Sequence, residues 1–181
     1  MATPPTFTTG AVLTAAQMNA VGFWLVKSAT LTSGNSNTIT DAFTSDFTNY
    51  KIVVSNLQAN DVANMYMRMG TTNTGYYYGG TRRTYSGTTT NGQGAGVSQW
   101  VIGFVPNSSN KSGGTIEIQM PQAAQRTTFQ SSFGDSRTDG DGVNMFTGFI
   151  DDSTQYTSFT FFLDGTVALT SCNIKIYGYR D

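Results

Sequence analysis

From residue 23 to the last residue, apolar side chains recur with a period of two, and no helical period interrupts this pattern. Residues 50–57 give the strongest signal, because their centre is β-branched and aromatic. Residues 65–69 place three methionines on one face and Tyr66 and Arg68 on the other. Side chains of a strand alternate between the two faces of a sheet. The period therefore predicts an all-β body, with the methionine face in its core.

Clusters of Gly, Asn, Ser, Asp and Pro separate the apolar segments at intervals of about 8–14 residues, a spacing typical of antiparallel sandwiches. We expect about nine or ten strands arranged as an antiparallel β-sandwich or jelly roll. The expected strands cover residues 23–32, 38–40, 50–57, 65–69, 97–105, 115–120, 127–133, 143–150, 156–163 and 170–179. The low-complexity residues 87–96 are predicted to form a loop, and Asp164 and Gly165 a tight turn.

Residues 1–22 follow a different pattern and are predicted to be an N-terminal arm with a short attachment helix, ahead of a β-sandwich domain over residues 23–181. Two prolines near the start favour an extended backbone. Residues 14–17 have the form of a capping box, and Gly22 ends the helical stretch. An isolated helix this short is marginal in water, so it must dock on a partner surface. The expected attachment residues are Phe7, Val12, Leu13, Met18, Phe23 and Trp24.

The low charge of the chain excludes several classes of partner. Charged residues make up 12% of the sequence, and the formal net charge is −1. No basic stripe is present to neutralise phosphates, so we expect no nucleic acid partner. No apolar run approaches the ~20 residues of a membrane-spanning helix, and the first residues lack the features of a signal peptide, so we expect no membrane insertion.

The sequence contains no histidine and one cysteine, Cys172. The absence of histidine removes the commonest general base and the commonest metal ligand, which argues against an enzyme. A single cysteine excludes an intrachain disulfide, and Cys172 is predicted to be a small buried side chain in a strand.

Residues 76–85 contain four tyrosines and two arginines among Gly and Thr residues. Both residue types offer flat faces for stacking and hydrogen-bond donors, which suits a sugar or a protein surface. Consecutive tyrosines of a strand point to opposite faces, so at least one is expected in the core, and ordinary strand packing is the alternative interpretation. The candidate ligand or receptor contacts are Tyr76, Tyr77, Tyr78, Arg82, Arg83 and Tyr85.

Asp135, Asp139 and Asp141 lie in an Asp/Gly-rich stretch, and their oxygens could bind a hard cation such as calcium. The stretch lacks the closing Glu of an EF-hand loop, and Arg137 supplies an internal counter-ion. A plain hairpin loop is therefore the favoured interpretation. We expect no cofactor and no dedicated metal site.

Two segments resemble proteins of tailed-bacteriophage virions. Residues 7–19, FTTGAVLTAAQMN, resemble the start of many tail fibre and minor tail proteins, in which an F-T-x-G-x-V-L-T-A-A-x-M-N segment precedes a β-rich body. Residues 173–181, NIKIYGYRD, are similar to the closing strand of the same kind of protein, which often finishes on I-x-I-Y-G. Because such proteins are usually trimers, the resemblance implies a homotrimer that contacts other virion proteins.

We therefore expect a structural virion protein of the tail-fibre or receptor-binding type. Its N-terminal segment anchors the chain, and its β-sandwich adsorbs to host-surface glycans. Residues 76–85 and 87–96 are expected at the exposed end. A capsid decoration or cement protein that stabilises the head is the alternative, and a glycan depolymerase is a minor one. The expected location is the virion, after assembly in the host cytoplasm.

Overall fold

The computed structural model describes residue 10 and residues 22–107, 111–136 and 140–180. The expected arm and helix lie outside these residues, together with four attachment candidates: Phe7, Val12, Leu13 and Met18. The described part of the chain forms twelve strands, and it contains no helix long and apolar enough to cross a membrane. The strands are β1 (Trp24–Leu31), β2 (Ser36–Ile39), β3 (Asn49–Ala59), β4 (Ala63–Met69), β5 (Tyr76–Thr84), β6 (Thr89–Val97), β7 (Trp100–Val105), β8 (Ser112–Gln119), β9 (Thr128–Asp135), β10 (Gly142–Ile150), β11 (Phe159–Leu163) and β12 (Leu169–Tyr179).

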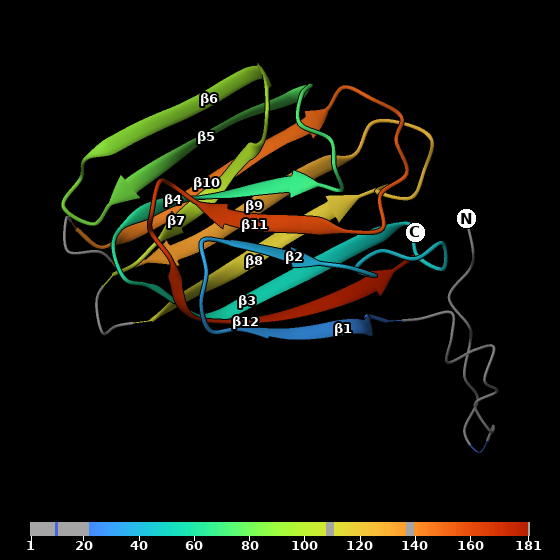
Figure 1. Ribbon diagram of the computed structural model, residues 1–181, viewed down its shortest axis with the longest axis horizontal. Helices are drawn as coiled ribbons and strands as arrows, with labels where there is room; N and C mark the ends of the chain where they lie inside the picture. The colour runs from blue at the N-terminus through green and yellow to red at the C-terminus, as the bar shows by residue number, and fades with distance from the viewer. Residues whose placement is uncertain (1–9, 11–21, 108–110, 137–139, 181) are drawn as a thin grey trace.

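The strands form two antiparallel sheets, which confirms the predicted all-β class (Figure 1). The large sheet has eight strands in the order β1-β12-β3-β8-β9-β10-β5-β6, and the small sheet has four in the order β2-β11-β4-β7. In Figure 1 the strands β2 and β11 of the small sheet cross over the large sheet as a second layer. Buried side chains from both sheets form one hydrophobic core.

The period of two decides which side chains enter this core. In β3, Tyr50, Ile52 and Val54 are at most 2% exposed, whereas the intervening residues are less buried. The three methionines of β4 are at most 1% exposed, as the alternation predicts. Cys172 is fully buried in β12, and burial raises the pKa of its thiol to about 12, so it is a small buried side chain as expected.

The prediction of a loop over residues 87–96 is wrong, because most of this stretch belongs to edge strand β6, which pairs with β5. Its glycines give the stretch a loop-like composition, but they serve close packing. A Cβ on Gly92 would lie 3.1 Å from the ring of Phe146, and a Cβ on Gly94 would overlap the ring of Tyr78. Side chains at these positions would push β6 away from the aromatic rings of Tyr78 in β5 and Phe146 in β10.

The stretch before β12 differs in detail from its prediction. The strand expected over residues 156–163 begins at Phe159, and Tyr156 is instead a buried side chain ahead of it. The turn at Asp164 and Gly165 is present, and the Val167 N–H donates to the Asp164 carbonyl oxygen at 3.1 Å. Since β11 and β12 belong to different sheets, this turn carries the chain from one layer to the other.

Buried tyrosines make the stability of the fold sensitive to alkaline pH. Burial is the main cause that raises the pKa of Tyr66 and Tyr156 to about 12 from the ordinary 10.0, and it raises the pKa of Tyr76 as well. The folded state therefore holds these phenolic protons more tightly than the unfolded state. Their contribution to stability is complete below about pH 10 and is lost as the pH rises towards 12.

Denaturant unfolding between about pH 8 and pH 11 is expected to show a falling free energy of unfolding above about pH 10. A Tyr156→Phe variant should show a shallower fall, because one proton-binding group with a raised pKa is gone. A free energy of unfolding that stays constant up to pH 11 would contradict this prediction.

Candidate binding groove on the outer face of the large sheet

The outer face of the large sheet carries a groove, and the strand registers place its residues in rows. One row crosses seven strands through Gly79, Thr147, Gln130, Glu117, Lys51, Tyr177 and Leu25. The neighbouring row contains Tyr77, Phe149, Thr128, Gln119, Asn49 and Tyr179. The groove has a volume of about 620 Å³ and is lined by residues of β5, β6, β8, β9 and β10. This volume lies within the range of small-molecule sites, about 300–1,000 Å³.

One wall of the groove is aromatic. The rings of Tyr77 and Phe149 stack with centroids 4.9 Å apart and an interplanar angle of 9°. The two residues are direct neighbours across β5 and β10. Beside them, a Cβ on Gly79 would meet no atom within 4 Å, so the lack of a side chain there leaves the floor open. The result is a flat apolar surface next to an empty space.

The floor of the groove is polar and uncharged. The Thr128 hydroxyl donates to Oε1 of Gln119 at 2.7 Å, which leaves the Nε2 group of that amide as a donor for a ligand. The Thr147 hydroxyl donates to the Phe129 carbonyl oxygen at 3.0 Å. Gln130 is exposed, and its amide makes no hydrogen bond within the described part of the chain. The floor therefore offers amide donors and acceptors to a bound molecule.

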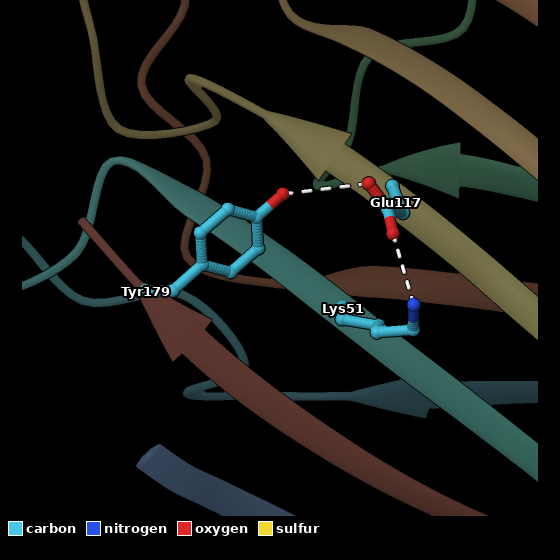
Figure 2. A network of polar contacts seen from close by, with 3 residues as sticks. All are labelled: Lys51, Glu117 and Tyr179. Atoms are coloured by element: carbon cyan, nitrogen blue, oxygen red, sulfur yellow. Dashed lines mark hydrogen bonds and ion pairs between the residues drawn. The ribbon is translucent and has the colours of Figure 1, made fainter. Parts of the chain in front are cut away.

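Glu117 lies at the end of the groove opposite the aromatic wall, where side chains from β3 and β12 hold its carboxylate (Figure 2). Lys51 Nζ of β3 lies 3.0 Å from Glu117 Oε1, and the Tyr179 hydroxyl of β12 donates to Oε2 at 3.4 Å. The Lys51 and Glu117 side chains are 33% and 38% exposed. A pair this exposed contributes at most about 1 kcal/mol to stability. The network therefore orients the carboxylate more than it stabilises the fold.

A second ion pair lies beside the aromatic wall. The Arg126 guanidinium donates to Asp151 Oδ1 from Nε at 2.9 Å and from Nη2 at 2.6 Å. The same guanidinium lies 4.9 Å from the centroid of the Phe149 ring. Arg126 and Lys51, the two cations next to the groove among the described residues, are thus paired with carboxylates.

The candidate contacts of residues 76–85 do not form one cluster. Tyr77 and Tyr78 both line the groove, although the Tyr78 ring packs on the core beside Phe146, 6.2 Å away between centroids. Tyr76 and Arg82 were expected to contact a ligand at the surface, but both are buried. Their side chains point between the sheets and are 0% and 8% exposed. The Tyr76 hydroxyl accepts the Met69 N–H and donates to the Thr72 carbonyl oxygen, and Arg82 donates to the Gly140 carbonyl oxygen.

The other two candidates lie outside the groove. Tyr85 follows β5 and is 75% exposed, and Arg83 is exposed two rows beyond the groove row of Gly79. The alternation of a strand explains the scatter, because it sends adjacent residues to opposite faces.

The remaining candidates stand as follows. Asp139 lies outside the described residues, so the calcium interpretation stays untested, and among the residues that the structure describes no three metal-ligating side chains come together. Phe23 is 57% exposed, and its ring lies 5.0 Å from that of Tyr179. Trp24 is half-buried at the start of β1 and lines a separate cavity of about 300 Å³.

Sequence reasoning missed most of the groove. The residues it did not single out are Glu117, Gln119, Thr128, Gln130, Thr147 and Phe149. Alternation with buried neighbours such as Ile116 and Ile118 does place Glu117 and Gln119 on an outer face. That signal is shared by every exposed strand position, so it does not distinguish a binding surface from an ordinary one.

The fold and the groove together define a two-sheet β protein with a candidate ligand site on the outer face of its large sheet. No known protein family and no curated protein matches this chain.

Proposed function

We propose that this chain is a virion protein of a tailed bacteriophage and that it adsorbs to host-surface glycans through the groove. The observation that carries the proposal is the Tyr77–Phe149 wall beside the amides of Gln119 and Gln130. A sugar ring has apolar C–H faces and a rim of hydroxyls. An aromatic wall packs against the C–H face, and amides, hydroxyls and a carboxylate form hydrogen bonds with the hydroxyls of the rim. The virion assignment rests on the resemblance of residues 7–19 and 173–181.

The proposed topology is a jelly roll with two inserted hairpins, and the strand order supports it. Without β5–β6 and β9–β10, the large sheet reads β1-β12-β3-β8 and the small sheet β2-β11-β4-β7. Among the eight remaining strands, the first pairs with the last, the second with the second-to-last, and so on. The pairs are β1 with β12, β2 with β11, β3 with β8, and β4 with β7. A long hairpin folded over on itself gives this nested order. The two insertions supply most of the groove.

The proposed anchoring end is the N-terminal segment together with the outer side of β1. Phe23 and Leu25 are each 57% exposed and continue directly from residues 1–22. Large exposed apolar side chains mark contact surfaces, and here they suit sister subunits of a homotrimer and other virion proteins. β1 is one edge of the large sheet, and the lining strands β9, β10, β5 and β6 form the other half, so anchoring at β1 would leave the aromatic wall of the groove open.

The proposal is tested by filling the groove without disturbing the fold. Gly79→Val should lower glycan affinity at least ~10-fold, because its side chain enters the open floor and no atom lies within 4 Å of the added Cβ. Gly134→Val is the matched control, since Gly134 is exposed on the same face, has equal space and does not line the groove. Binding is measured on an array of oligosaccharides and bacterial surface polysaccharides, followed by calorimetry.

Two results would contradict the proposal. One is a wild-type chain that binds no glycan, and the other is equal glycan affinity of wild type and Gly79→Val. The position of the chain is tested by a cryo-EM reconstruction of the particle that contains it. Density at the tail supports the adsorption role, whereas density spread over the capsid lattice would make the chain a decoration protein.

A further inference from the structure

The groove shows a charge pattern that bears on which glycans it can hold. Apart from tyrosines, Glu117 is the one ionisable side chain among the described residues that line it. The floor residues Gln119, Thr128, Gln130 and Thr147 are neutral. A ligand that lies across this floor therefore meets amides, hydroxyls and one carboxylate.

In the described part of the chain, the two cations beside the groove, Lys51 and Arg126, are each paired with a carboxylate. Lys51 Nζ lies 3.0 Å from Glu117 Oε1, so the positive charge is balanced by the carboxylate that lines the groove. Arg126 donates two hydrogen bonds to Asp151 and covers the Phe149 ring. A guanidinium recognises a sugar carboxylate or sulfate best through two parallel hydrogen bonds, and Asp151 Oδ1 already occupies the Nε–Nη2 edge of Arg126 and pairs its charge.

An acidic sugar in this groove would lose part of its hydration without gaining a free cation. It would also lie against the carboxylate of Glu117, which lines the groove, whereas Lys51, which pairs with that carboxylate, does not line it. Removing an anion from water without a compensating partner is costly, and a nearby like charge adds to that cost. A neutral sugar loses no charge solvation, and its hydroxyls can donate to Glu117 and exchange hydrogen bonds with the amides.

We infer that the groove selects uncharged glycans, built from neutral hexoses or N-acetylhexosamines, and rejects glycans that carry carboxylate or sulfate groups. This inference rests on the proposed glycan-binding function of the same groove. An N-acetyl group suits the site in two ways. Its amide matches the free amide of Gln130, and its methyl group can lie on the Tyr77–Phe149 wall.

The inference is tested with matched oligosaccharides that differ in one group. A neutral glucose oligomer is compared with a glucuronate oligomer of the same linkage, and an N-acetyllactosamine chain with its sialylated form. Calorimetry on the full chain is expected to show at least ~10-fold tighter binding of the neutral member in the pair that binds. Glu117→Gln should narrow this difference, because it removes the negative charge and frees Lys51. Asp41→Asn is the control, since Asp41 is 86% exposed and pairs with Lys27, away from the groove.

The outcomes separate the inference from the function on which it rests. Preference for the acidic member, abolished by Gly79→Val, would overturn the inference and leave the glycan-binding proposal standing. A neutral preference that Glu117→Gln leaves unchanged would overturn the charge mechanism. Failure of both members of every pair to bind, or binding that Gly79→Val does not weaken, would remove the proposed function and the inference together.

Discussion

Replacing Trp100 by alanine is expected to lower the free energy of unfolding by about 3–5 kcal/mol, the cost typical of a fully buried aromatic side chain. Trp100 is 0% exposed and belongs to β7 of the small sheet. Its ring lies 4.4 Å from Phe129 and 5.2 Å from Tyr76, centroid to centroid, and both partners belong to the large sheet. Alanine would leave a cavity between the sheets, where the structure relaxes only partly.

The indole also supports the groove from below. Its Nε1–H donates to the carbonyl oxygen of Phe149 at 3.2 Å, and Phe149 and Phe129, the ring on which the indole packs, are both lining residues of the groove. We therefore expect Trp100→Ala to weaken the proposed glycan binding in addition to lowering stability. Trp100→Phe keeps an aromatic ring and loses the hydrogen bond, so its cost should be smaller than that of alanine.

Both variants are measured by denaturant unfolding followed by far-ultraviolet circular dichroism, so that the signal does not depend on the indole that is removed. A loss below about 1 kcal/mol for Trp100→Ala would contradict the prediction. It would mean that this contact between the two sheets contributes little to the fold.

Replacing Gly148 by valine is expected to cost at least about 3 kcal/mol, at or above the upper end of the usual overpacking range. Gly148 lies in β10 opposite Tyr78 of β5. A Cβ there would overlap the backbone carbonyl oxygen of Tyr77 and lie 2.8 Å from Cα of Tyr78. The obstacle is backbone and not the end of a flexible side chain, so β5 and β10 must separate to relieve it.

The control for this prediction is Gly79→Ala on the neighbouring strand. Gly79 has an open Cβ position and no positive φ, so alanine should be neutral or stabilising by up to about 1 kcal/mol. Denaturant midpoints of the two variants are compared with wild type. Equal stability of Gly148→Val and wild type would show that β5 and β10 do not approach as closely as the register requires.

The all-β class was predictable from the sequence because alternation is local. The burial of the β4 methionines and of Cys172 follows from the identity of each residue and its near neighbours in the chain. The same reasoning located Tyr77 in a segment with binding chemistry and anticipated that one of its neighbours would be core, which proved to be Tyr76. It misjudged β6, because glycines that admit aromatic rings from other strands resemble loop glycines in a single sequence.

The sequence by itself determined that the body is all-β and which face of each well-patterned strand is buried. Only the tertiary structure decided which outer-face residues meet. Tyr77 stacks on Phe149 and Lys51 pairs with Glu117 because antiparallel registers join strands distant in the chain. Register depends on the packing of the opposite, buried face and on the connections between strands. No short window of sequence contains that information, so the groove emerges only when the eight strands of the large sheet are assembled.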